Sequence, residues 1–293
     1  MRAKGGDEGS PSLDPAPPQT KGGPAGRSLA QAVATAGVLL GAMGVVFLLG
    51  QAAFFALIVA VALVCLWELF DGLVRAGGRP VVPFGLACAG AMVAVAYFER
   101  PGLVGAVLVV TMFGAFLLAL RPGRGHNAAS DVAWTVLGVT WIGGGGAGAA
   151  SILVLGPDGL QLLVAFVLIA ALDDIGAYFT GTRFGAHRMA PSISPGKSWE
   201  GFAGGLICSL VGGGICAAVL APLGVADGVA LGALCGVFGP VGDLAESLVK
   251  RTVGIKDSGR LLPGHGGFLD RLDAMILCAP VVFLYLRFVA ELA

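Results

Sequence analysis

The sequence predicts an all-α, polytopic integral membrane protein with about nine transmembrane helices and a cytoplasmic amino terminus. Of its 293 residues, 56% are hydrophobic and only 12% are charged, and the mean hydropathy is +0.88. Soluble domains carry about 25% charged residues. The apolar residues gather into runs of roughly 20, the length that a helix needs to cross a bilayer. Basic residues cluster in alternate connections between these runs, which indicates a fixed orientation.

The chain divides into a polar tail and a long apolar region. Residues 1–27 are rich in Pro, Gly, Ser and charge, so we expect a disordered cytoplasmic tail. Residues 28–170 would form the amino-terminal transmembrane helices, and residues 171–293 the carboxy-terminal ones that carry the polar motifs. The predicted spans are 28–50, 52–72, 81–98, 102–120, 132–156, 160–180, 201–223, 228–249 and 270–290.

The composition of these runs favours closely packed helices. Lipid-facing strands would alternate polar and apolar residues, whereas these runs are apolar all round. Glycines within the runs predict close approach of neighbouring helices, as small residues allow in membranes. A break in the helix or a pore lining is the alternative for Gly143–Gly146.

The basic residues predict the orientation. A cytoplasmic tail makes the connections 73–80, 121–131, 181–200 and 250–269 cytoplasmic as well. The tail and these connections, with the adjacent Arg271, then hold 16 of the 18 Lys and Arg residues, all but Arg100 and Arg287. This distribution agrees with the positive-inside rule and places the carboxyl terminus outside the cytoplasm.

Two classes of site are disfavoured. The six cysteines lie inside apolar runs without CxxC spacing or nearby histidines, so neither a zinc site nor a disulfide framework is expected. The formal net charge of zero gives no indication of a nucleic-acid partner, and we expect none.

Two polar clusters stand at the edge of the carboxy-terminal spans, where ionisable groups in apolar helices suggest function. The first is Asp173–Asp174, followed by Tyr178, for which anchoring at the membrane interface is the alternative. The second runs from Ser194 through Lys197 to a predicted helix start, a place that suits phosphate. It is not a P-loop, because Pro191 occupies the position of the first glycine. An ordinary basic loop is its alternative.

The third cluster extends from residue 243 to residue 273. Asp243, Glu246, Ser247 and Lys250 follow the spacing i, i+3, i+4, i+7 and share one helical face. Asp270 and Asp273 share a face of the next span. Two facing sets of carboxylates repel each other unless a positive group lies between them, and a hard cation is the usual solution. Ion pairing with Lys250, Arg251 or Arg271 is the alternative.

The residues around these carboxylates indicate phosphate chemistry. Hard cations beside lysines, arginines and a glycine-rich turn are the components that stabilise phosphates during transfer. His265 lies between glycines in this turn, where it could orient a phosphate, act as an acid or be a structural turn residue. The sequence does not decide between these roles.

The third cluster carries a family resemblance. The stretch SLVKRTVGIKDSGRLLPGHGGFLDRLD, residues 247–273, resembles the signature of the phosphatidate cytidylyltransferase family. DIGAYFTG from Asp174 and SPGKSWEG from Ser194 are also similar to motifs of that family, so the resemblance covers about residues 172–274. Gly196 stands where the family often has a charged residue, and Ala274 where serine is common.

The resemblance implies a reaction, and composition and charge suggest a membrane location. CTP and phosphatidic acid would condense to CDP-diacylglycerol and pyrophosphate with the help of Mg²⁺. A monovalent cation beside the Mg²⁺ and a homodimer are left open. The Ala- and Gly-rich composition suggests a bacterium, in which this multi-pass chain would lie in the plasma (inner) membrane. The positive-inside count places the active site at the cytoplasmic face. A CTP-dependent polyprenol or phytol kinase is the nearer alternative, and a transporter the more distant one.

The resemblance also assigns roles to residues. Expected metal ligands are Asp243, Asp270, Asp174 and Glu246. Expected catalytic residues are Lys250, Arg271, His265 and Asp273. Expected substrate-binding residues are Ser194, Lys197, Arg251, Lys256, Gly266 and Gly267.

Overall fold

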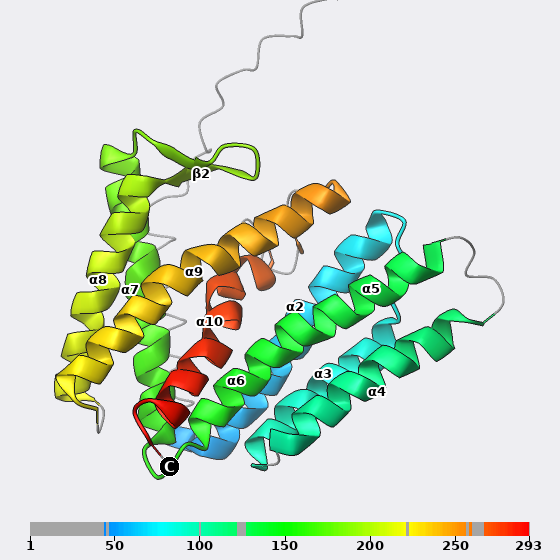
Figure 1. Ribbon diagram of the computed structural model, residues 1–293, viewed down its shortest axis with the longest axis horizontal. Helices are drawn as coiled ribbons and strands as arrows, with labels where there is room; N and C mark the ends of the chain where they lie inside the picture. Colours follow the sequence, from blue (N-terminus) through cyan, green and yellow to red (C-terminus); the bar gives the residue numbers. More distant parts are fainter. Residues whose placement is uncertain are drawn as a thin grey trace, which may run out of the picture. The chain divides into compact units, whose positions relative to one another are not determined.

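Each predicted span from residue 52 onward coincides with a helix (Figure 1). The computed structural model describes residues 44, 47–99, 101–121, 127–220, 223–255, 258–259 and 267–292. The predicted tail 1–27 and nearly all of the span 28–50 lie outside them. The elements are α2 (Gln51–Arg75), α3 (Val82–Tyr97), α4 (Pro101–Ala119), α5 (Ala128–Gly138), the π-helical turn η2 (Val139–Gly143), α6 (Gly144–Leu153), α7 (Gly159–Phe184), β1 (Arg188–Ala190), β2 (Ser194–Ser198), α8 (Trp199–Val219), α9 (Val225–Val253) and α10 (Leu269–Phe288).

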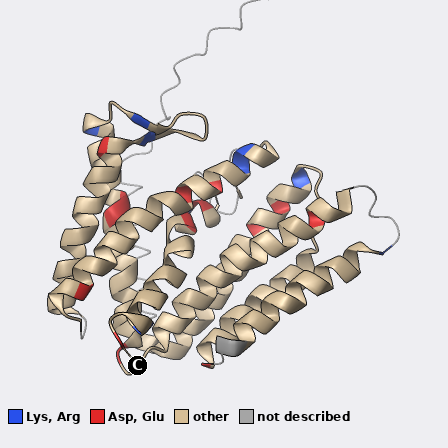
Figure 2. Ribbon diagram, viewed as in Figure 1, with Lys and Arg blue, Asp and Glu red and all other residues tan. Residues whose placement is uncertain are grey.

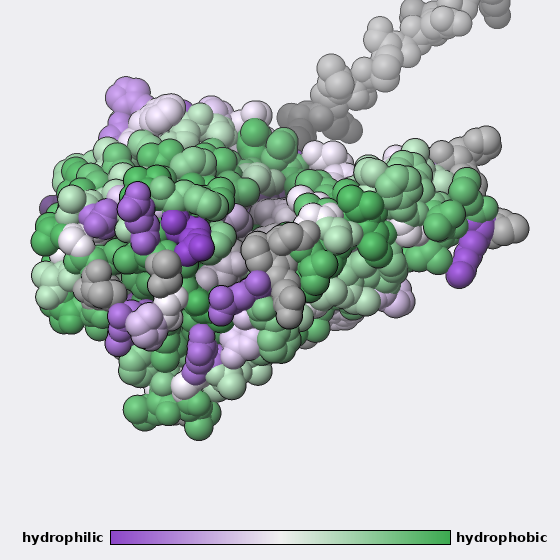
Figure 3. All heavy atoms as spheres, turned by 60° about the horizontal axis from the view of Figure 1, so that its bottom comes forward, coloured by the Kyte–Doolittle hydropathy of each residue, from purple (hydrophilic) through white to green (hydrophobic). Residues whose placement is uncertain are grey.

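The lengths and composition of these helices are those of a multi-pass membrane protein. Among the described residues, five helical stretches are long and apolar enough to cross a bilayer: α2, Ala128–Leu153, α7, α8 and α9. Hydrophobic residues also cover most of the molecular face in Figure 3, and hydrophilic residues form only separate spots there. The prediction of an all-α polytopic protein is therefore confirmed, whereas the count of nine and the side of the amino terminus stay predictions.

The connections predicted to be cytoplasmic lie at one end of the compact unit Val46–Ala293. The carboxyl ends of α2 and α9, the start of α5 and the strand β2 all lie at the upper end in Figure 1. Lys and Arg residues gather at this same end in Figure 2. The predicted division of the spans at residue 170 stays a prediction.

A small β-hairpin is the departure from an all-helical structure in the described part of the chain. Strands β1 and β2 pair antiparallel, with Arg188 opposite Ser198. The Ser198 hydroxyl accepts a hydrogen bond from the Gly201 amide (3.2 Å) and caps α8. The stretch predicted as a loop before a helix is therefore an ordered hairpin that ends at a helix start and carries Lys197.

The buried core lies mainly between α2, α3 and the α5–η2–α6 rod. Leu66 and Phe70 of α2 are fully buried there with Ile142 of η2. The chain stays helical through Gly143–Gly146, so the alternative of a break at these glycines is wrong. Helix α10 packs against both α6 and α9 and joins this core to the α7–α8–α9 layer.

Glycine allows α6 and α10 to approach each other closely. A Cβ atom at Gly148 would lie 2.5 Å from the backbone nitrogen of Pro280, whereas one at Gly105 on α4 would meet nothing within 4 Å. We expect Gly148→Ala to lower the free energy of unfolding by about 1–3 kcal/mol, because the backbones must separate. Gly105→Ala should leave it unchanged or raise it by up to about 1 kcal/mol. Thermal unfolding in detergent checks both, and equal melting temperatures would contradict this account of the packing.

Candidate active site

A pocket of about 470 Å³ receives side chains from all three sequence clusters. It lies between α7, β2, α9 and the first turn of α10. Its lining consists of carboxylates, cationic side chains, a serine and the apolar or aromatic side chains of α7. These residues are Asp174, Ile175, Tyr178, Phe179, Lys197, Asp243, Ser247, Asp270, Arg271 and Asp273.

Helix packing brings the two acidic faces together. Asp243 and Ser247 are one turn apart on α9, and Asp270 and Asp273 are three residues apart on α10, so each pair shares a face. Gly242 allows the two helices to approach, because a Cβ atom there would lie 2.9 Å from the Cα atom of Ala274. The faces that the sequence predicts to meet therefore line one pocket.

Lys197 connects the hairpin to α9. Its Nζ forms an ion pair with Asp243 and donates a hydrogen bond to the Pro240 carbonyl oxygen (3.3 Å). The Lys197 and Asp243 side chains are about one-quarter exposed, at 24% and 26%. A cationic group thus stands at the pocket wall beside a carboxylate.

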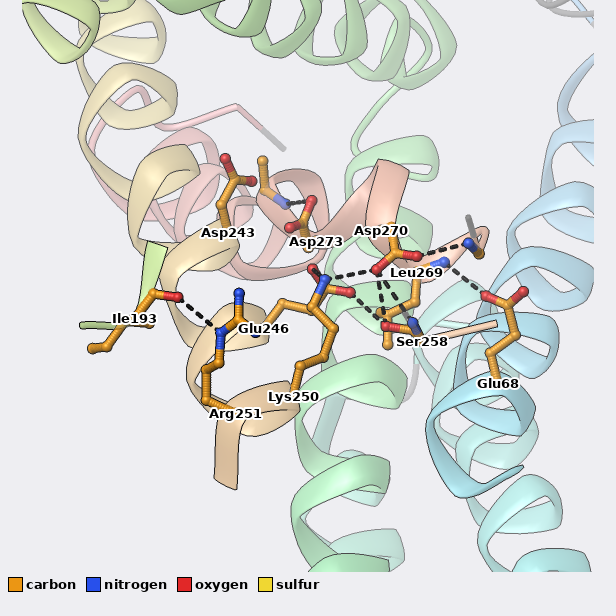
Figure 4. A network of polar contacts seen from close by, with 12 residues as sticks. Glu68, Ile193, Asp243, Glu246, Lys250, Arg251, Ser258, Leu269, Asp270 and Asp273 are labelled. Carbon is orange, nitrogen blue, oxygen red and sulfur yellow. Dashed lines mark hydrogen bonds and ion pairs between the residues drawn. The ribbon is translucent and has the colours of Figure 1, made fainter. Parts of the chain in front are cut away.

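Lys250 lies between two carboxylates on neighbouring helices (Figure 4). Its Nζ is 2.8 Å from Glu246 Oε2 and 2.7 Å from Asp270 Oδ1. The Glu246 side chain is 4% exposed and that of Lys250 is 16% exposed. Ion pairing, the alternative to a cation between the acidic faces, is therefore present for these three residues.

Asp270 has a full set of donors around both of its oxygens. Besides Lys250, Oδ1 lies 3.1 Å from the Ser258 hydroxyl, whose single proton it shares with Glu246, and Oδ2 accepts a hydrogen bond from the Gly267 amide (2.7 Å). The Ser258 hydroxyl also contacts Glu246 Oε1 at 2.7 Å. Several charge-assisted contacts together hold a carboxylate firmly.

Three further carboxylates come from α7 and α10. Asp273 is buried and accepts a hydrogen bond from the Ala274 amide (3.0 Å). Asp173 does not line the pocket, is only 3% exposed, and has no partner for its Oδ1 among the described residues. Asp174, the neighbour of Asp173, is more exposed and lines the pocket.

The other predicted site residues have different surroundings. Arg251 is exposed, and its Nε donates to the Ile193 carbonyl oxygen (3.3 Å), so it holds the hairpin against α9. Ser194 begins β2 next to that contact. Arg271 is at the pocket. The predicted residues Lys256, His265 and Gly266 lie outside the described residues.

The donor set of the pocket fits a hard cation. Its four carboxylates, Asp174, Asp243, Asp270 and Asp273, offer only oxygen, and the described residues that line the pocket include neither histidine nor cysteine. Oxygen-only sites suit Mg²⁺ or Ca²⁺. Within the described ranges, no three His, Cys, Asp or Glu side chains already converge as a complete metal site. Lysine amines now neutralise Asp243 and Asp270.

Two residues of the network are absent from the sequence-based set of site residues. Ser258 is 1% exposed and joins Glu246 to Asp270. Glu68 of α2 is fully buried and accepts a hydrogen bond from the Leu269 amide (3.0 Å). An ionisable residue within the apolar run 52–72 is the signal that could have drawn attention to Glu68.

Comparisons with known proteins identify the family. A sequence model of the cytidylyltransferase family matches residues 30–289. The phosphatidate cytidylyltransferase of Mycobacterium bovis is 35% identical over 95% of this chain and 96% of its own length. That of Mycobacterium tuberculosis is 36% identical over 95% of this chain and 90% of the relative. That of Brucella suis is 42% identical over 46% of this chain and 50% of the relative. The chain therefore belongs to the cytidylyltransferase family.

Proposed function

We propose that this chain is a phosphatidate cytidylyltransferase, which joins CTP and phosphatidic acid to give CDP-diacylglycerol and pyrophosphate. The pocket carries this proposal. It combines cationic Lys197 and Arg271, which suit phosphates, with carboxylates that suit a hard cation. The α7 residues Ile175 and Phe179 add apolar surface, which suits the glycerol and acyl part of a lipid. Family membership and the names of the near full-length relatives support the same reaction.

The proposed reaction needs positioning more than proton transfer. An oxygen of the lipid phosphate forms a bond to the α-phosphorus of CTP, and the bond from that phosphorus to the pyrophosphate oxygen breaks. The nucleophile is already anionic, so a strong general base is not required. Lys197 and Arg271 would hold phosphate oxygens in place, and Lys250 would keep Asp270 oriented through their ion pair.

We propose that Mg²⁺ is the cofactor. Asp243 and Asp270 would hold it with help from Asp174 and Asp273, all of which line the pocket. When bound, Mg²⁺ would neutralise charge on the triphosphate and on the departing pyrophosphate. Both oxygens of Glu246 and both oxygens of Asp270 already have partners, so each of these residues would join the ligands only after releasing some of them.

We further propose that the pocket faces the cytoplasm from a plasma (inner) membrane. Lys197 of the hairpin and residues of the first turn of α10 line the pocket. The hairpin lies at the end of the bundle where Lys and Arg gather (Figure 2). The positive-inside rule assigns such an end to the cytoplasm. CTP would then arrive from the aqueous side, and the lipid from the bilayer.

The nucleotide product tests the proposed function. Purified full-length protein in detergent would be incubated with labelled CTP, phosphatidic acid and Mg²⁺. We expect a CDP-lipid and pyrophosphate, loss of both with a chelator, and recovery after Mg²⁺ is added back. Release of CDP with a newly phosphorylated lipid would instead support a kinase. No turnover by protein that elutes as a folded, monodisperse species would refute the proposal.

Lys197→Met is expected to weaken binding of the phosphate-bearing substrates. Loss of one charge-assisted contact is worth about 1.5–3 kcal/mol, so we expect kcat/KM for CTP to fall by roughly 10–100-fold. Lys197→Arg keeps the charge and should recover part of this loss. Steady-state kinetics with varied CTP measure the effect. Equal kcat/KM in the wild type and Lys197→Met would exclude a phosphate-binding role.

A further inference from the structure

Glu68 has an ionisable side chain in an unusual place. It lies on α2, within an apolar helix, and its exposed fraction is 0%. It does not line the pocket. Burial of a carboxylate in such surroundings is costly unless its contacts compensate for the lost water. Its contacts therefore indicate what the residue does.

The first contact caps α10. Glu68 Oε2 accepts the Leu269 amide at 3.0 Å, and Leu269 is the first residue of that helix. The residue at the cap position, Phe268, provides no side-chain hydrogen bond. The first amides of a helix lack partners within the helix and carry the positive end of its dipole. A carboxylate from a helix 201 residues earlier in the chain provides the missing acceptor.

Further contacts hold the two stretches that flank the site. Added Cβ atoms at Gly259 and at Gly267 would each collide with the Glu68 carboxylate, so both glycine backbones lie directly against it. Two turns further along α2, Arg75 Nη2 donates to the Ser258 carbonyl oxygen at 3.0 Å. Helix α2 therefore holds residues 258–259 and residues 267–269 at the same time.

The stretches held by α2 are the ones that hold Asp270. Ser258 and Gly267 donate to opposite oxygens of the Asp270 carboxylate, at 3.1 and 2.7 Å. Leu269, which Glu68 caps, directly precedes Asp270 in the chain. Figure 4 shows Glu68 and Asp270 on either side of Leu269 and the start of α10. A shift of the α10 start would therefore move the Asp270 carboxylate.

The second oxygen of Glu68 argues against simple space filling. Glu68 Oε1 is buried, and no hydrogen-bond partner for it is found among the described residues. An apolar side chain of similar size would fill the same space but would give the Leu269 amide no acceptor. The glutamate is therefore suited to this position by its acceptor and by its reach to Leu269.

We infer that Glu68 is a positioning residue, which fixes the start of α10 so that Asp270 faces the pocket. This inference rests on the proposed function, because the expected consequence is a lower rate of CDP-lipid formation. Glu68 acts through Leu269, Gly259 and Gly267, and it does not touch the substrates. The length of the Glu68 side chain, which lets it reach the Leu269 amide, matters more for this role than its charge.

Two variants of Glu68 separate reach from charge. Glu68→Asp keeps the carboxylate but shortens the side chain by one methylene, which withdraws the acceptor from Leu269. Glu68→Gln keeps the reach and one acceptor oxygen but removes the charge. Because small misplacements at a reacting centre cost up to about 100-fold, we expect kcat of Glu68→Asp to fall at least about 10-fold. Its KM for CTP should stay within about 2-fold, and Glu68→Gln should retain kcat within about 3-fold.

Amide hydrogen exchange gives a readout that does not depend on activity. In Glu68→Asp, peptides that cover 258–259 and the first turn of α10 should exchange faster than in the wild type, whereas α3 and α6 should not change. Leu66→Ala is the packing control, because Leu66 is fully buried on the same helix and contacts the α5 side of the core. It should lower the melting temperature without changing exchange at α10.

The outcomes are distinct. Faster exchange at α10 and a lower kcat in Glu68→Asp, with both recovered in Glu68→Gln, support the inference. It is overturned if Glu68→Asp matches the wild type, if Glu68→Gln is impaired as strongly, or if Leu66→Ala shows the same loss of kcat. A wild-type protein that makes no CDP-lipid would refute the proposed function, and unchanged exchange in Glu68→Asp would then refute the positioning role separately.

Discussion

Asp270→Asn is expected to reduce CDP-lipid formation by at least about 10³-fold, equivalent to about 4 kcal/mol of transition-state stabilisation. Asp270 accepts from Lys250, Ser258 and Gly267, so both of its oxygens face donors. An asparagine must turn its NH₂ group toward some of these donors, because an amide has only one acceptor oxygen. The variant also loses the charge that Asp270 would contribute to Mg²⁺.

The measurement is the rate of CDP-lipid formation at several Mg²⁺ concentrations. Asp158→Asn is the matched control, because Asp158 precedes α7 and lies at the far end of that helix from Asp174. It should keep the wild-type rate within about 2-fold, since substitutions far from a reacting centre have small effects on it. A rate for Asp270→Asn within 10-fold of the wild type would exclude Asp270 from the reacting centre.

The spans were predictable from sequence because the bilayer restricts the solutions. Each of the runs from 52–72 to 270–290 had to satisfy its backbone polar groups internally, and apolar runs of this length do so as helices. The meeting of Asp243 with Asp270 and Asp273 was also foreseeable, because local spacing places each set on one face. The sequence could not show that Gly242 lies at the contact between these helices.

Contacts between distant segments were beyond sequence reasoning. Glu68 and Leu269 are 201 residues apart, and Lys197 and Asp243 are 46 apart, so neither pair follows from a helical period. The choice between a cation and an ion pair was also left open. Glu246 and Lys250 are neighbours on one helix, but the contact from Lys250 to Asp270 depends on how α9 packs against α10. The hairpin was missed because β1 and β2 are only three and five residues long.

Lys250→Met is expected to lower the free energy of unfolding by about 3–5 kcal/mol, because it leaves Glu246 and Asp270 close together without their shared cation. The same change at Lys197 is the control. Its ion pair with Asp243 is about one-quarter exposed, so the expected loss of stability is at most about 1 kcal/mol. Thermal unfolding in detergent measures the loss of stability in each variant. The loss in Lys250→Met is then compared with the loss in Lys197→Met.

A second substitution separates stability from catalysis. Glu246→Gln combined with Lys250→Met removes one of the two stranded carboxylates and keeps an acceptor for Ser258. We expect the double variant to recover at least half of the lost stability, since the repulsion between Glu246 and Asp270 disappears. Its CDP-lipid formation should stay low, because Asp270 still lacks the amine that orients it. Full recovery of activity together with stability would mean that Lys250 serves the fold alone, and no recovery of stability would mean that repulsion between the carboxylates is not what the single variant suffers.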